Sequence, residues 1–153
     1  MAWSTPYGRY QVAPLEQKDI PQVAALERLV FLEPLPEEGL RAKHQLPTVV
    51  YLAAKDDSRV VAYFGFEIFA PYAHVLANAT HPDYRRQGLA TFLLTAAEPL
   101  ARDRGARAFV GEVRRSNAPQ LALLKQLGWV RSAIIPAFFG NGEDAHVVIR
   151  VLP

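Results

Sequence analysis

A polar, glycine-containing stretch between two apolar segments holds the residues of this chain that are best suited to chemistry. Residues 80–90 read Thr-His-Pro-Asp-Tyr-Arg-Arg-Gln-Gly-Leu-Ala, and an apolar helix is expected to begin within the last of them. Gly88 has no side chain and Ala90 has one methyl group, so backbone N–H groups can approach phosphate oxygens closely. Arg85 and Arg86 add forked donors to phosphate. The pattern predicts a pyrophosphate-binding loop; the alternative is an ordinary strand-to-helix turn with two solvated arginines.

Four segments, taken in order, resemble one family. The spacing Arg85-x-x-Gly88-x-Ala90 resembles the acetyl-CoA signature of the GNAT superfamily of N-acetyltransferases. Residues 76–82 are similar to that superfamily's fourth strand, and residues 111–129 to its fifth strand and fourth helix. Residues 138–145 resemble the tail of its ribosomal-protein alanine N-acetyltransferase branch. Together the resemblances extend over residues 10–153.

The order of predicted elements indicates one α+β domain over residues 1–153, with no linker or repeat. Strands are predicted at residues 10–13, 48–54, 60–69, 73–80, 106–113, 129–135 and 146–152. Helices are predicted from a cap at Asp19 to the prolines at 34 and 36, and at 37–45, 88–104 and 117–127. Pro99 is expected to kink the third helix or to end it early. The resemblance implies a mixed, mostly antiparallel central sheet of about seven strands, flanked by about four helices and splayed between strands four and five.

Composition excludes several classes of protein. Half of the 153 residues are hydrophobic, and a net charge of +2 is too small to argue for nucleic acid as a partner. The absence of cysteine excludes a disulfide framework and a thiolate nucleophile, and the four histidines show no metal-ligand spacing. The apolar runs fall far short of the ~20 residues that span a bilayer, and no secretory signal is visible. We therefore expect a cytoplasmic protein with no metal, nucleic-acid or membrane partner; a homodimer remains open.

The resemblance implies that acetyl-CoA, as co-substrate, binds along the end of the fourth strand and the loop after it. Backbone N–H groups there would hold the thioester carbonyl and the pantetheine. Asn78 is a departure, because an aliphatic residue is usual at its position. Asn117 resembles a family asparagine that contacts the cofactor, and it is equally suited to cap a helix. The implied cofactor contacts are Asn78, Ala79, Thr80, Arg85, Arg86, Gln87, Gly88, Leu89, Ala90 and Asn117.

Acetyl transfer to an amine also needs a group that accepts the ammonium proton. Glu112 stands where the alanine N-acetyltransferase branch places a glutamate base. By strand alternation it shares an otherwise apolar face with Val110 and Ala108. The alternative for Glu112 is a strand-end ion pair with an arginine, Arg114 or Arg131. His74, at the start of the fourth strand, is the rival candidate for the base.

The family's usual proton donor to the departing thiolate is a tyrosine in an ALYxxLGF pattern. Residues 122–129 read Ala-Leu-Leu-Lys-Gln-Leu-Gly-Trp, so this position is Leu124. Leucine cannot donate a proton. Water, another residue such as Tyr84, or direct departure of the thiolate would replace the tyrosine, or the protein has a changed role.

These observations predict an acetyl-CoA-dependent N-acetyltransferase in which a primary amine attacks the thioester directly. A protein or peptide N-terminus is favoured as acceptor, because the resemblance extends to residues 138–145. A small-molecule amine, such as a polyamine, an amino acid or an aminoglycoside, is the alternative acceptor. From another class, an acyl-CoA-binding module without turnover would also explain Leu124. A structural or nucleic-acid-binding domain would leave the loop without a purpose.

Overall fold

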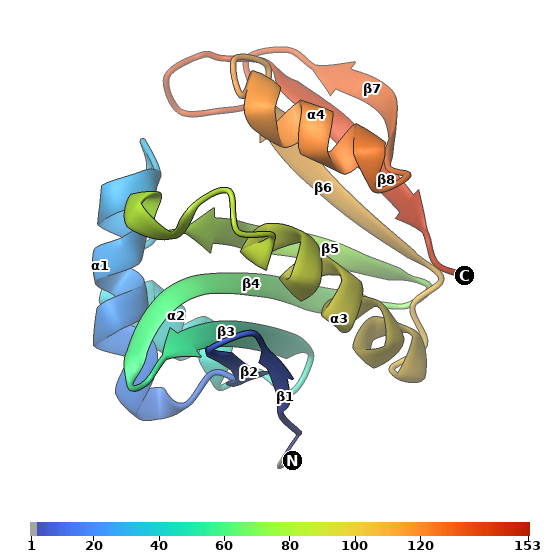
Figure 1. Ribbon diagram of the computed structural model, residues 1–153. Helices are drawn as coiled ribbons and strands as arrows, with labels where there is room; N and C mark the ends of the chain where they lie inside the picture. Colours follow the sequence, from blue (N-terminus) through green and yellow to red (C-terminus); the bar gives the residue numbers. More distant parts are fainter. Residues whose placement is uncertain (1–2) are drawn as a thin grey trace. The chain divides into compact units, whose positions relative to one another are not determined.

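The computed structural model describes residues 3–153. Its strands are β1 (Thr5–Tyr7), β2 (Tyr10–Pro14), β3 (Val49–Asp56), β4 (Arg59–Phe69), β5 (Tyr72–Thr80), β6 (Ala108–Arg114), β7 (Val130–Ile135) and β8 (Ala145–Val151). Its α-helices are α1 (Ile20–Val30), α2 (Glu37–His44), α3 (Leu89–Asp103) and α4 (Ala118–Gln126). The strands form one sheet in the order β1-β2-β3-β4-β5-β6-β8-β7 (Figure 1). The pairs β1–β2, β2–β3, β3–β4, β6–β8 and β7–β8 are antiparallel, whereas β5–β6 is parallel, so the predicted α+β class with a mostly antiparallel sheet is confirmed.

The chain divides into two compact units, which are described separately below. Unit 1 comprises the chain up to Glu67 together with Leu76–Glu98. Unit 2 comprises Ile68–Val75 and Pro99–Pro153. Strand β5 and helix α3 therefore each contribute residues to both units.

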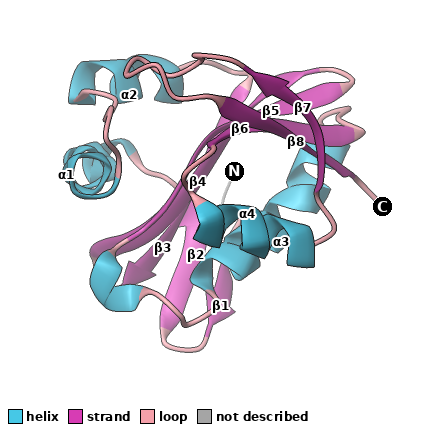
Figure 2. Ribbon diagram, turned by 90° about the horizontal axis from the view of Figure 1, so that it is seen from above, coloured by secondary structure: helices cyan, strands magenta, loops and turns pink. Residues whose placement is uncertain are grey.

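In unit 1, helices α1 and α2 cover one face of strands β2 to β4 (Figure 2). Apolar residues recur on α1 at helical spacing and turn one stripe toward the strands. Burial of this stripe removes its apolar surface from water, which is the main stabilising term of such a layer. The core residues that these elements share are Ile20, Val23, Ala24, Leu26, Leu40, Tyr51, Ala53, Val60 and Tyr63.

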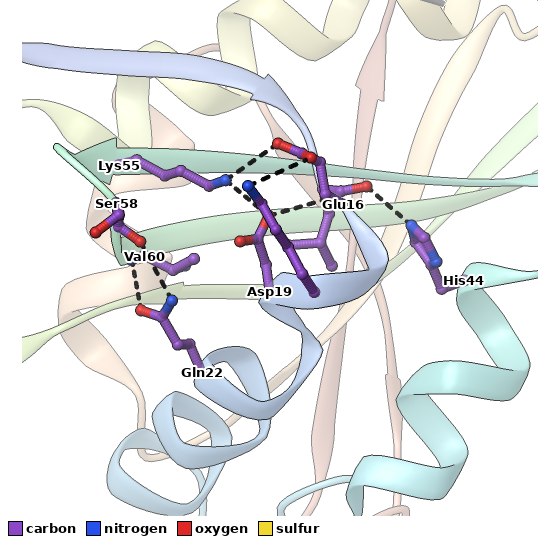
Figure 3. Close-up of polar contacts among 9 residues, drawn as sticks. Glu16, Asp19, Gln22, His44, Lys55, Ser58 and Val60 are labelled. Carbon is purple, nitrogen blue, oxygen red and sulfur yellow. Dashed lines mark hydrogen bonds and ion pairs between the residues drawn. The ribbon is translucent and has the colours of Figure 1, made fainter.

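The start of α1 differs from the prediction. Asp19 was expected to cap the helix, but it has helical backbone angles at the end of a short 3-10 turn and makes no side-chain cap bond to α1. Its buried carboxylate instead accepts the Glu16 backbone N–H at 3.0 Å and the Lys55 ammonium at 2.8 Å (Figure 3). Asp19 therefore stands at the predicted position directly before α1 but its side chain does not cap the helix, because the turn that precedes α1 directs this carboxylate back toward Glu16 and β3.

Two further polar residues attach α1 to its surroundings. Gln22 accepts the Val60 backbone N–H at 2.9 Å and donates to the Ser58 carbonyl at 3.2 Å, which ties α1 to the β3–β4 turn (Figure 3). The buried Glu27 accepts the Leu35 backbone N–H at 2.8 Å and the hydroxyl of Tyr63. Burial raises the pKa of Glu27. These bonds fix both ends of α1 against the strands of unit 1.

Unit 2 is built from β6, β8, β7 and α4 (Figure 1). Strand β8 pairs antiparallel with β6 from Ala108↔Val151 to Arg114↔Ala145. Phe109 and Trp129 stack with ring centroids 5.8 Å apart and form the aromatic part of its core. The start of β5 pairs in parallel with the start of β6 over three residue pairs, and this short ladder places His74 beside β6.

Most predicted elements lie within a few residues of their expected places. Strand β1 was missed, although its signal is present: Gly8 precedes Arg9 between two tyrosines, and Gly8 has φ of +58°. A two-residue turn with glycine first is typical of a tight hairpin. Helix α3 continues through Pro99, so an early end at that residue is excluded.

Candidate active site

The two residues proposed as rival bases are hydrogen-bonded to one another. His74 Nε2 lies 2.8 Å from Glu112 Oε1 and 3.1 Å from Glu112 Oε2. The register explains the contact, because His74 is opposite Val110 in the parallel β5–β6 ladder and Glu112 is two residues further along the same face. The His74 side chain is 39% exposed and that of Glu112 is 18% exposed. The pair is therefore partly buried yet open to solvent.

A carboxylate bonded to an imidazole is a proton-accepting unit. Each partner restricts the orientation of the other, and a proton taken up by the pair can be shared between nitrogen and oxygen. The two arginines considered as ion-pair partners of Glu112 contact other residues. Arg114 contacts Glu143 at 3.1 Å, and Arg131 lies 3.4 Å from His146 Nδ1.

The predicted phosphate loop lies in unit 1 and has an unusual backbone. Arg86 has φ of +61° and Gly88 has φ of +77°, so two residues of this short loop adopt the left-handed conformation. That conformation is uncommon for a residue with a side chain. Helix α3 begins at Leu89, which is buried, and Phe92 N–H donates to the Gly88 carbonyl at 2.9 Å as its first turn forms. The guanidinium of Arg85 reaches back to the Thr80 carbonyl at 3.4 Å.

The end of β5, also in unit 1, holds an unpaired polar group. Ala79 is buried, and Asn78 beside it places its side-chain Nδ2 out of solvent with no hydrogen-bond partner among the described residues. A buried donor without an acceptor is costly and is uncommon in folded proteins. Asn78, which stands where an aliphatic residue was expected, is therefore also the residue with an unsatisfied buried donor.

Two predicted positions lie at α4 in unit 2. The Asn117 side chain accepts the Gln120 backbone N–H at 3.3 Å, so it does cap the helix, and its contact with a cofactor stays a prediction. Leu124 is buried, with 4% of its surface exposed. Tyr84, named as a substitute proton donor, belongs to unit 1 and donates its hydroxyl to Asp56 at 3.3 Å.

The burial of Leu124 leads to a testable prediction. We expect Leu124→Tyr to lower the free energy of unfolding by about 1–3 kcal/mol, because a phenol is larger than the isobutyl group it replaces in a packed site. Urea denaturation measures this loss. The pH profile of kcat then decides the chemistry: a new falling limb at high pH would identify the phenol as a proton donor, whereas an unchanged profile would show that turnover proceeds without it.

A network of polar contacts anchors the β7–β8 loop of unit 2. Arg114 contacts Glu143 and donates to Asn141 Oδ1 at 3.0 Å, while its guanidinium lies 4.1 Å from the ring centroid of Phe139. Glu143 also accepts the Ser116 backbone N–H at 2.7 Å. The hydrogen bonds from Ser116, with a smaller contribution from Arg114, lower the pKa of Glu143. The loop is thus held against the end of β6.

The lowered pKa of Glu143 predicts a pH dependence of stability. Because the folded state favours the ionised carboxylate, the stabilisation by Glu143 is present above the ordinary carboxyl pKa and is lost as the pH falls through the lower folded-state pKa. We expect wild type to be more stable than Glu143→Gln at pH 7, and this difference to shrink below pH ~4. Urea unfolding of both proteins between pH 7 and 3 measures it. A difference that is constant over this range would contradict the assignment.

Comparison with known proteins decides the family. Residues 20–129 match the acetyltransferase (GNAT) family. An N-alpha-acetyltransferase of Saccharolobus solfataricus is 30% identical over 156 residues, with 88% of each chain covered. The chain belongs to the GNAT family of acetyltransferases. The predicted resemblance is confirmed.

Further relatives agree with this assignment. The [ribosomal protein bS18]-alanine N-acetyltransferase of Escherichia coli is 29% identical over 146 residues, covering 93% of this chain and 96% of the relative. A crystal structure of the Escherichia coli ribosomal-protein-alanine N-acetyltransferase has a TM-score of 0.84 at 25% identity, with 94% of each chain covered. Arabidopsis thaliana NAA60 in complex with acetyl-CoA has the same fold, with a TM-score of 0.86 at 15% identity, 93% of this chain and 98% of that chain being covered.

Within this GNAT chain, the predicted site residues fall into two groups. His74 and Glu112 are in contact within unit 2, which also contains Asn117. The cofactor residues at 78–80 and 85–90 belong to unit 1. No helix in residues 3–153 is both long enough and apolar enough to cross a membrane.

Sequence reasoning missed two residues that contact the loop. The Tyr7 hydroxyl donates to the Gln87 carbonyl at 2.6 Å, and the Tyr10 hydroxyl donates to Gln87 Oε1. Their position at the two ends of the Gly8–Arg9 turn was the available signal for the hairpin. Nothing in the sequence indicated that this hairpin contacts a loop some eighty positions later.

Proposed function

We propose that this GNAT enzyme transfers the acetyl group of acetyl-CoA to the α-amino group of a protein or peptide. The observation that carries the proposal is the hydrogen bond between His74 and Glu112, because it provides a partly buried proton acceptor on one face of the paired strands β5 and β6. The loop at residues 80–90 supplies the second requirement, a backbone suited to the diphosphate of CoA.

The proposed roles follow from the chemistry of each group. Backbone N–H groups near Ala79 and Thr80 would polarise the thioester carbonyl, and those of Gly88 to Ala90 would bind the diphosphate at the start of α3. Glu112, oriented by His74, would take the proton from the amine as its nitrogen attacks the carbonyl carbon. The carbon–sulfur bond then breaks and the thiolate leaves.

The acceptor is proposed from the relatives. One relative is named for acetylation of α-amino groups and another for acetylation of a ribosomal-protein alanine. A protein N-terminus therefore ranks above a small-molecule amine. The proposal retains two predictions made from the sequence: that residues 1–153 act as one functional domain and that the enzyme works in the cytoplasm.

Two measurements test the proposal in order. Isothermal titration calorimetry with acetyl-CoA should show binding to the purified chain. Release of free CoA thiol should then be measured with peptides that begin with alanine, with the same peptides blocked at the α-amino group, and with a polyamine. Turnover with the free peptides alone is expected. Turnover with the polyamine but not with the peptides would overturn the acceptor assignment.

A non-catalytic acyl-CoA-binding role is the second candidate, and Leu124 is the specific observation in its favour. A buried leucine stands where the family places its tyrosine proton donor. Binding of acetyl-CoA without thiol release for any amine would support this role. The intact His74–Glu112 pair favours the enzyme instead, because a binding module has no need of a proton acceptor.

A further inference from the structure

The first β-hairpin contacts the 80–90 loop through two tyrosines. Strands β1 and β2 are joined at Gly8 and Arg9, and Tyr7 and Tyr10 stand at the two ends of this turn. The Tyr7 hydroxyl donates to the Gln87 carbonyl oxygen at 2.6 Å, and the Tyr10 hydroxyl donates to the Gln87 side-chain oxygen. One loop residue is thus held at both its backbone and its side chain, by residues 80 and 77 positions away in the chain.

The bond to the Gln87 carbonyl has a direct consequence for the next residue. The peptide unit between Gln87 and Gly88 is planar and trans, so its C=O and N–H point in opposite directions. With the carbonyl directed at Tyr7, the Gly88 N–H is directed away from the hairpin. The hydroxyl of Tyr7 therefore sets the direction of a backbone donor at the start of α3.

The hairpin also contacts the first turn of α3. The ring of Tyr7 packs on Phe92 with centroids 4.5 Å apart. A Cβ atom placed on Gly88 would fall against the Tyr7 hydroxyl oxygen, whereas the next atom of that ring, Cζ, lies at 3.5 Å. Glycine at position 88 thus serves two needs: a φ of +77° and room for the Tyr7 hydroxyl.

The loop requires such support because of its backbone. Arg86 and Gly88 both have positive φ, and left-handed residues persist where surrounding contacts hold them. Arg86 is solvent-exposed. Gln87 lies between Arg86 and Gly88, and the hydroxyls of Tyr7 and Tyr10 both donate hydrogen bonds to it.

We propose that the N-terminal hairpin is a positioning element for the diphosphate of CoA, with Tyr7 and Tyr10 fixing the loop in its binding-competent form. This inference rests on the proposed function, because it takes the 80–90 loop to bind that diphosphate. Tyr7 and Tyr10 act through Gln87, and the bound phosphates contact the N–H groups that Gln87 orients.

Tyrosine-to-phenylalanine variants test the inference while they preserve the rings. We expect Tyr7→Phe to raise the Kd of acetyl-CoA about tenfold in calorimetry, the scale of one lost hydrogen bond, and Tyr10→Phe to raise it by a smaller factor. Tyr72→Phe, an exposed tyrosine of unit 2, is the matched control and should bind like wild type. Unchanged or tighter binding by Tyr7→Phe would overturn the inference. Absence of binding by wild type would instead overturn the proposed function.

A ligand without the diphosphate separates positioning from a general structural role. S-acetylpantetheine carries the thioester arm alone, so its affinity should be the same in wild type and in Tyr7→Phe. An equal loss of affinity for both ligands would overturn the inference, because it would show that the variant disturbs more than the phosphate loop.

A double-mutant cycle tests the hydroxyl itself. The alanine of Gly88→Ala must adopt a positive φ in both wild type and Tyr7→Phe. The energetic cost of this φ therefore cancels when the two effects are compared. The clash with the Tyr7 hydroxyl is absent in the Tyr7→Phe background. We therefore expect Gly88→Ala to weaken acetyl-CoA binding several-fold more in wild type than in Tyr7→Phe. Equal effects in the two backgrounds would overturn the role assigned to the hydroxyl.

Discussion

Replacing Glu112 by glutamine should lower kcat by about 10²-fold or more at pH 7, which is the usual contribution of one acid–base group. The amide keeps the shape of the side chain and can still accept a hydrogen bond from His74, but it cannot take up a proton. The Kd of acetyl-CoA should be unchanged, because the proposed role of Glu112 is toward the amine. Thiol release with an N-terminal peptide measures kcat, and calorimetry measures the Kd.

Two companion variants make this result specific. Glu38→Gln changes an exposed glutamate of α2 in unit 1 and should retain wild-type kcat. His74→Ala should also lower kcat, and the double variant with Glu112→Gln should be little worse than Glu112→Gln alone, since residues that act as a unit are non-additive. If His74→Ala abolishes turnover and Glu112→Gln does not, the histidine is the base and our assignment is wrong.

The elements that could be predicted are those with strong local signals. The long α3 ends at Asp103, two residues before Gly105, whose φ is +93°, and α4 begins after a capping asparagine. The β3–β4 hairpin follows from two runs of β-branched and aromatic residues around a polar turn. In each case the residues that determine the element lie within or next to it.

Contacts that depend on register and on distant packing could not be predicted. His74 and Glu112 are 38 positions apart, and their bond depends on the parallel register that pairs His74 with Val110. From the sequence alone they were two competing candidates. The bonds from Tyr7 and Tyr10 to Gln87 depend in the same way on where a hairpin packs. Asp19 shows that a local rule can fail, since its carboxylate pairs with Lys55 on β3.

Substitution of Gly88 in the phosphate loop should have the second large effect, on the binding of acetyl-CoA. We expect Gly88→Glu to bind acetyl-CoA far more weakly than wild type while the chain stays folded. Any side chain at this position meets the Tyr7 hydroxyl and must adopt a φ of +77°, which together distort the loop. A carboxylate adds repulsion of the diphosphate, and two like-charge contacts at ~5 Å in water amount to roughly 1–2 kcal/mol, or about tenfold in Kd.

Gly88→Gln separates the two causes, because glutamine has the shape of glutamate without the charge. Both variants should lose affinity through the distorted loop, and Gly88→Glu should lose about tenfold more at low ionic strength. Salt shortens the range of charge repulsion, so this extra loss should decrease as the ionic strength is raised toward 1 M. Thermal melts of both apoproteins would verify that they remain folded. Near-wild-type affinity in a folded Gly88→Glu would rule out the loop as the diphosphate site, and equal affinities of the two variants at all salt concentrations would show that no phosphate lies near residue 88.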